Sequence, residues 1–177
     1  DDADRDWLPQ VRGSPGSPTV HAAVAIAWAG SGPVTAAAGT LLCLRRHGRR
    51  RGTRVAVRWL LAVGAGGAVE AATKTIVARP GPTPVVTDVA AARVGIAPGS
   101  FPSGHVITAV LAGALLARLH PTPWARAAAA AWPAVIAWSR LTLAAHWPAD
   151  VAGGALAGIA VALCWAALTA RRTPGAP

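Results

Sequence analysis

The chain has 177 residues, a length typical of one domain. Apolar residues make up 53% of it and charged residues only 14%, whereas a soluble domain carries roughly a quarter charged residues. The net charge is +10, but the basic residues gather in short segments between apolar stretches. This distribution argues against a nucleic-acid-binding surface and favours a membrane protein.

Residues 1–19 precede the first long apolar stretch. Within them, residues 1–10 are acidic and include two large apolar side chains, Trp7 and Leu8. We expect residues 1–19 to form an interfacial segment on the outer membrane surface.

Five stretches approach the roughly 20 apolar residues that a helical membrane span needs, namely residues 20–44, 55–77, 106–119, 124–138 and 151–170. The third and fourth reach this length only if Ser103–His105 and the residues beside Pro121 join their helices. Abundant small residues suit close helix packing in a bilayer. The sequence therefore predicts an all-α, polytopic transmembrane bundle of about five spans over residues 20–170, followed by a short cytoplasmic tail, residues 171–177.

The basic segments define the expected topology. Seven arginines lie between residues 45 and 58, in the connection between the first two spans. If this connection is cytoplasmic, residues 79–101 and 140–148 are outside, and the remaining basic clusters fall inside. We therefore expect a multi-pass protein of the cell (inner) membrane. Four tryptophans are expected at the two interfaces, Trp59 and Trp124 at the inner one and Trp138 and Trp147 at the outer one.

This topology brings a set of polar residues to the outer ends of the spans. Polar residues that persist at one membrane face are functional candidates. Cations together with two imidazoles suit nucleophilic attack on an anion, with proton transfer to its leaving group. The set comprises Glu70, Lys74, Arg79, Ser103, His105, Arg140, His146 and Asp150.

The segment from Arg140 to Asp150 contains the first candidate group. His146 and Asp150 are four residues apart, so one helical turn that starts at Pro148 puts them side by side. A carboxylate against one ring nitrogen makes the other nitrogen the nucleophile. Arg140 presents a planar fork that matches phosphate oxygens. A capping His–Asp contact with an interfacial arginine explains the same residues about equally well.

The other candidates lie before the third span and at the end of the second. Ser103 is expected as an N-cap, Gly104 permits close backbone approach, and His105 faces the anion site at the helix N-terminus. The alternative is an ordinary capped helix start with an interfacial histidine. Lys74 is spaced to pair with Glu70, although a lysine there also suits snorkelling to the interface.

These residues resemble the type 2 phosphatidic acid phosphatase family, which is related to the vanadium haloperoxidases. Its motifs are K-x6-R-P, P-S-G-H and S-R-x5-H-x3-D. The second matches residues 102–105 in full and the third matches residues 139–150 in full. The first departs from the pattern, because six residues after Lys74 the chain reads Gly81-Pro82. Arg79 is then a possible substitute for the missing motif arginine.

The resemblance covers residues 20–170 and implies an all-helical fold of normally six spans, so that a further span precedes residue 1. It implies that His146 attacks phosphorus, Asp150 holds its ring and His105 protonates the leaving oxygen. Lys74, Arg79, Ser103, Gly104 and Arg140 would bind the phosphate. No metal or other cofactor is implied, because these cations take the part of Mg²⁺.

The implied activity is hydrolysis of a lipid phosphomonoester or pyrophosphate, of the phosphatidate, phosphatidylglycerol phosphate or isoprenyl phosphate type. The expected partners are this substrate and the bilayer, with no nucleic acid. Gly81 leaves open a weakened or inactive member that binds lipid phosphates. A small channel or transporter is a third alternative, which does not explain two histidines at helix starts. The headgroup, the lipid chain and the oligomeric state are not readable from the sequence.

Overall fold

A computed structural model describes residues 2–85 and 99–170 of the chain. The described residues contain helices and no strand, as predicted. The expected cytoplasmic tail, residues 171–177, lies outside the described residues, as do residues 86–98 of the expected outer segment. The helices are α1 (Asp2–Val11), α2 (Pro18–Ala29), α3 (Gly32–Val77), α4 (Gly104–Leu119), α5 (Pro123–Thr142) and α6 (Pro148–Ala170).

Prolines and short polar residues set the starts of several helices. Pro18 opens α2, and the Ser17 hydroxyl accepts a hydrogen bond from the Val20 N–H at 3.3 Å. Thr122 caps α5 in the same way, ahead of Pro123. Proline suits these positions because its missing N–H has no helical partner there. Pro148 opens α6, as the sequence predicts.

The first predicted span, residues 20–44, is not one helix. α2 ends at Ala29 and α3 starts at Gly32, with Pro33 in its first turn. The prediction of a continuous helix is therefore wrong, because proline lacks the N–H that a continuous helix would use. α3 then includes both the rest of this first run and the whole second run, with a non-helical residue at Gly48 (φ 68°).

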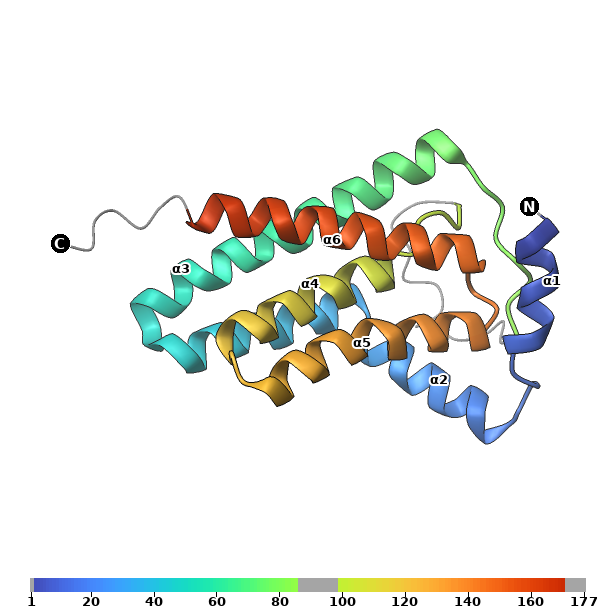
Figure 1. The fold of residues 1–177 in the computed structure, drawn as a ribbon, viewed down its shortest axis with the longest axis horizontal. Coiled ribbons are helices and arrows are strands. Elements are labelled where there is room, and N and C mark those ends of the chain that lie inside the picture. Colours follow the sequence, from blue (N-terminus) through green and yellow to red (C-terminus); the bar gives the residue numbers. More distant parts are fainter. Residues whose placement is uncertain (1, 86–98, 171–177) are drawn as a thin grey trace.

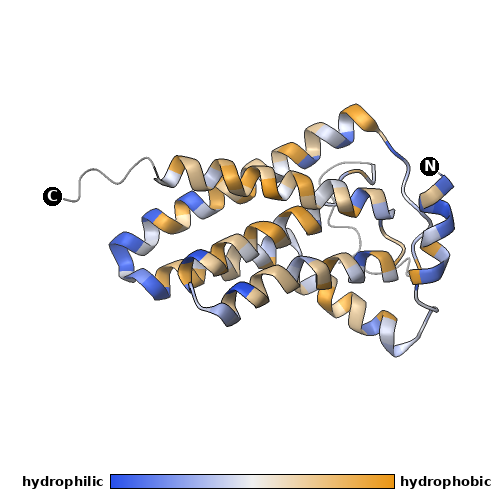
Figure 2. Ribbon diagram, viewed as in Figure 1, coloured by the Kyte–Doolittle hydropathy of each residue, from blue (hydrophilic) through white to orange (hydrophobic). Residues whose placement is uncertain are grey.

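The arrangement of the helices places α1 and the basic turn of α3 at opposite ends of the bundle (Figure 1). Figure 2 shows the turn of α3 as a hydrophilic tip between apolar segments. α4 packs against α3, α5 and α6 and is the central helix. Among the described residues two helices, Gly32–Val77 and Pro148–Thr169, are long and apolar enough to cross a membrane, and α2 and α4 are shorter apolar helices.

Close packing in the bundle depends on small residues. A side chain at Gly39 would collide with the indole of Trp59, and one at Gly113 would collide with the backbone of α5. Trp59 is fully buried, donates to the Ala36 carbonyl at 3.1 Å and meets Trp165 edge to face. Trp59 therefore packs inside the bundle rather than facing the lipid, because Gly39 makes room for its indole, and its depth at the inner interface stays a prediction.

Candidate active site

The end of the bundle that contains α1 collects all the residues predicted for the site. They come from the end of α3 and the segment after it, the start of α4, the end of α5, the turn that follows and the start of α6. The structure buries Glu70, Lys74, Ser103, His105, Arg140, His146 and Asp150, and leaves the Arg79 side chain 20% exposed. Residues distant in sequence are therefore buried at the same end of the bundle, and their chemical roles stay a prediction.

The His146 ring has a defined orientation. Its Nδ1 lies 2.9 Å from the Ser100 carbonyl oxygen and 3.6 Å from Oδ2 of Asp150. Since a carbonyl only accepts, Nδ1 carries the proton and Nε2 keeps its lone pair. The hydrogen bond goes to Ser100, and at the longer distance the Asp150 carboxylate acts on the ring mainly through its charge.

A tight turn delivers His146 to this position. Ala144 adopts a left-handed conformation (φ 47°), and the Ala145 N–H donates to the Arg140 carbonyl at 3.0 Å. Ser100 is fixed in turn, because its N–H donates to the Arg79 carbonyl at 2.9 Å. The turn that contains His146 is therefore connected through Ser100 to the segment that follows α3.

The surroundings keep His146 neutral. Burial lowers its pKa below the ordinary value for histidine, while the nearby Asp150 carboxylate opposes this effect. The positive charges of Arg140 and Lys74 lower the pKa further. At neutral pH the ring is thus available as a nucleophile.

The start of α4 presents two polar atoms to the same pocket. The His105 ring donates a hydrogen bond to the Ala27 carbonyl of α2. Its Nε2 and the Ser103 hydroxyl are buried and have no hydrogen-bond partner among the described residues. Ser103 occupies the N-cap position of α4 without a side-chain capping bond. The prediction of Ser103 as the N-cap residue is therefore confirmed, although its hydroxyl makes no capping hydrogen bond.

Lys74 and Arg140 are both buried, with exposed fractions of 4% and 1%. Lys74 pairs with Glu70 at 2.7 Å, so it does not snorkel to the interface. Both cations lie close enough to His105 and His146 to act on them electrostatically. The Glu70 carboxylate fills the space where a side chain at residue 104 would lie. Gly104 is therefore needed for the approach of Glu70 to α4.

Arg79 binds two carboxylates in the structure. One terminal nitrogen contacts Oδ1 of Asp150 at 2.9 Å and the other contacts Asp4. Burial of Arg79 disfavours its charged form, but the bonds and charges of Asp4 and Asp150 outweigh this effect and raise its pKa above the ordinary value. This geometry makes Arg79 a clamp on Asp150. Its predicted role as a phosphate ligand would use N–H donors of the guanidinium that these two contacts leave over.

Sequence reasoning missed Asp4 as a member of the site. Asp4 is 5% exposed, and its second oxygen accepts from the Ala149 N–H at 3.0 Å, at the start of α6. Asp4 and Leu8 are four residues apart and form the buried face of α1, a spacing that the sequence does contain. Their partner surface lies more than 70 residues away, so no local pattern identifies it.

Removal of the Asp4 carboxylate should release α1 from the bundle. We expect Asp4→Ala to speed amide hydrogen exchange in residues 2–11 about tenfold or more, because a hydrogen bond to a charged group contributes roughly 1.5–3 kcal/mol. Asp6→Ala is the matched control, because Asp6 is exposed and its side chain makes no described contact. Equal exchange in the two variants would show that Asp4 does not hold the helix.

Comparison with known proteins places this geometry in a family. The PAP2 superfamily pattern matches residues 55–174, which include all three motif segments. The fold is similar to the crystal structure of a transmembrane PAP2-type phosphatidylglycerolphosphate phosphatase from Bacillus subtilis, with a TM-score of 0.76 and 17% sequence identity over 98% of this chain and 86% of that one. No curated protein matches the sequence. Because the family pattern takes in more than half of the chain, this helical membrane protein belongs to the PAP2 superfamily.

Proposed function

We propose that the protein is an integral membrane phosphatase that hydrolyses a phosphomonoester or pyrophosphate of a lipid through a phosphohistidine. The observation that carries this proposal is the His146 ring, whose Nδ1 hydrogen bond to Ser100 leaves Nε2 free to attack. Two buried cations and a second histidine beside it supply the charge and the proton that phosphoryl transfer needs.

In the proposed first step, Nε2 of His146 forms a bond to phosphorus while the bond to the leaving oxygen breaks. His105 donates the proton that this oxygen takes up. Its Nε2 has no described partner, while the ring is hydrogen-bonded to Ala27, which supports this assignment. In the second step water attacks phosphorus, His105 accepts its proton, and phosphate and free His146 are regenerated.

The phosphoryl oxygens gather negative charge during both steps. We assign Lys74 and Arg140 to these oxygens, together with the Ser103 hydroxyl and the first N–H groups of α4, starting at Gly104. Asp150 stabilises the imidazolium character that His146 acquires, and Arg79 holds Asp150 in place. Direct binding of phosphate by Arg79 is the alternative role for that residue.

A second candidate function follows from Gly81. Among the described residues a Cβ at this position would meet only Ser100, at an ordinary 3.5 Å, so the backbone here does not require a glycine. A protein with one phosphate donor fewer could be a weak phosphatase or a binding protein for lipid phosphates. Restoring an arginine with Gly81→Arg distinguishes the two, since it should raise the turnover of a weak enzyme.

We further propose a place in the cell (inner) membrane with the active site outside. The basic turn of α3 lies at the end of the bundle opposite to the site (Figure 2), which supports this orientation. The substrate comes from the bilayer, with a headgroup of the phosphatidate, phosphatidylglycerol phosphate or isoprenyl phosphate type. Independence of metal ions stays part of the proposal.

The test is phosphate release from a panel of these lipids by the detergent-solubilised protein. We expect release to persist in EDTA and to fall at least about a thousandfold in His146→Ala, because the nucleophile is lost. His21→Ala is the control, since His21 is exposed and outside the site. Release that EDTA abolishes, or that His146→Ala retains, would contradict the mechanism.

A further inference from the structure

Two cavities lie outside the catalytic cluster, between α1 and the segment after α3. The first has a volume of about 240 Å³ and is lined by Arg5, Arg79, Pro80 and Trp147. The second, of about 230 Å³, shares Arg5 and Trp147 with the first and is extended by Arg12. Arg5 therefore lines both cavities, and Arg12 lines the second.

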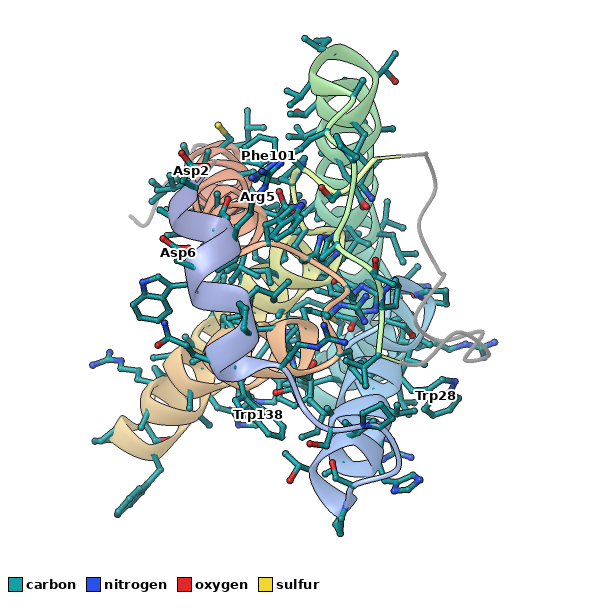
Figure 3. The ribbon with its side chains drawn as sticks, turned by 90° about the vertical axis from the view of Figure 1, so that its right-hand side faces the viewer. Asp2, Arg5, Asp6, Trp28, Phe101 and Trp138 are labelled. Carbon is teal, nitrogen blue, oxygen red and sulfur yellow. The ribbon has the colours of Figure 1, made fainter. Side chains whose placement is uncertain are left out.

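Arg5 and Arg12 are both unused by the site described above. Arg5 lies on α1 and Arg12 directly follows its last residue, and both side chains line the second cavity. Both are exposed, and within the described part of the chain neither side chain makes an ion pair or hydrogen bond. Figure 3 looks onto this end of the bundle and shows Arg5 and Asp6 on opposite sides of α1, with Arg5 on the side of Phe101. Asp6 therefore does not neutralise this face.

Asp4 does not neutralise the face either, because its carboxylate is engaged elsewhere. One oxygen binds Arg79 and the other accepts from the backbone of α6. This engagement also fixes α1, and with it the position of Arg5. The cavities therefore carry the charge of Arg5 and Arg12, which has no carboxylate partner in the described residues, whereas the Arg79 side chain is paired with Asp4 and Asp150.

Trp147 links the cavity to the catalytic cluster. It follows His146 directly, its indole N–H donates to the Pro80 carbonyl at 2.9 Å, and its ring lies 5.8 Å from the Arg79 guanidinium carbon. The same side chain thus forms a wall of the cavity and supports the segment that carries the nucleophile. A headgroup that extends from His146 past this ring would enter the cavity that Arg5 lines.

We propose that this cavity is a second anion subsite, which binds a second phosphate group of the substrate through Arg5 and Arg12. This inference rests on the proposed phosphatase function and narrows it to lipids with two phosphate groups. In this proposal Lys74 and Arg140 bind the reacting phosphate, and Arg5 and Arg12 bind the second phosphate. Arg5 of α1 and Arg12, which follows α1, thereby supply cations beside Pro80 and Pro82, on either side of Gly81, where the first motif lacks its arginine.

Two chemistries provide a second phosphate near the first. In a pyrophosphate the two groups are adjacent, as in an isoprenyl pyrophosphate, and in phosphatidylglycerol phosphate a glycerol separates them. Phosphatidate has a single phosphate and is the reference substrate. Comparing kcat/KM for these three substrates separates the effect of a second phosphate from the effect of the distance between the two phosphates.

The experiment compares Arg5→Gln/Arg12→Gln with the wild type by kcat and KM in detergent. We expect the ratio of kcat/KM for the preferred two-phosphate lipid to kcat/KM for phosphatidate to fall about tenfold, mainly through KM, since each exposed charge pair contributes up to roughly a few-fold. Arg126→Gln is the matched control, because it removes an exposed arginine at the opposite end of the bundle and should leave the ratio unchanged. An unchanged ratio in the double variant would overturn the proposal.

A binding measurement keeps this test independent of turnover. Inorganic pyrophosphate should raise the melting temperature of the wild-type protein more than inorganic phosphate does, and the double variant should lose this difference. If the wild type releases phosphate from no lipid, the phosphatase proposal fails while this measurement still decides on the subsite. Equal stabilisation by pyrophosphate in both proteins would rule the subsite out.

Discussion

The buried carboxylate of Asp150 makes the contacts on which the arrangement of the site depends. It is fully inaccessible to solvent, and a buried charge is tolerated only when it is paired and hydrogen-bonded. One oxygen binds Arg79 and the other accepts from the Trp147 N–H at 2.9 Å, near the His146 ring. The backbone carbonyl of Asp150 accepts from the Ser103 N–H at 2.9 Å. One residue thus joins α6 to the end of α3, to the start of α4 and, through Arg79 and Asp4, to α1.

The break between α2 and α3 also helps to position a residue of the site, His105. A helix end leaves its last carbonyl groups without helical partners. Here the Ala27 carbonyl bonds to the His105 ring, and the Gly30 carbonyl lies 3.5 Å from the Thr108 hydroxyl. An unbroken helix would use the Ala27 carbonyl internally and leave His105 without this support. The break between α2 and α3, which the hydropathy pattern does not reveal, therefore helps to orient His105, the proposed general acid.

The predictability of each feature from sequence depended on the range of its interactions. His146 and Asp150 were identified because their spacing and Pro148 are local signals of a helix start. The break at Gly30 also has a local signal, in Gly32 and Pro33, but the long apolar run outweighed it. Asp4 has no such signal, because its partners lie in distant segments. The hydrogen bond from His146 to the Ser100 carbonyl was not predicted for another reason. Every residue has a backbone carbonyl, so the sequence does not indicate which one accepts.

The central claim is that Nε2 of His146 takes the phosphoryl group while Nδ1 stays bonded to Ser100. The most direct measurement is to quench the reaction with a labelled lipid phosphate and to locate the phosphate by mass spectrometry under alkaline conditions, which preserve phosphohistidine. The account predicts phosphate on His146, attached at Nε2, and none in His146→Ala. Phosphate on another residue, attachment at Nδ1, or turnover with no covalent phosphate at any time would contradict it.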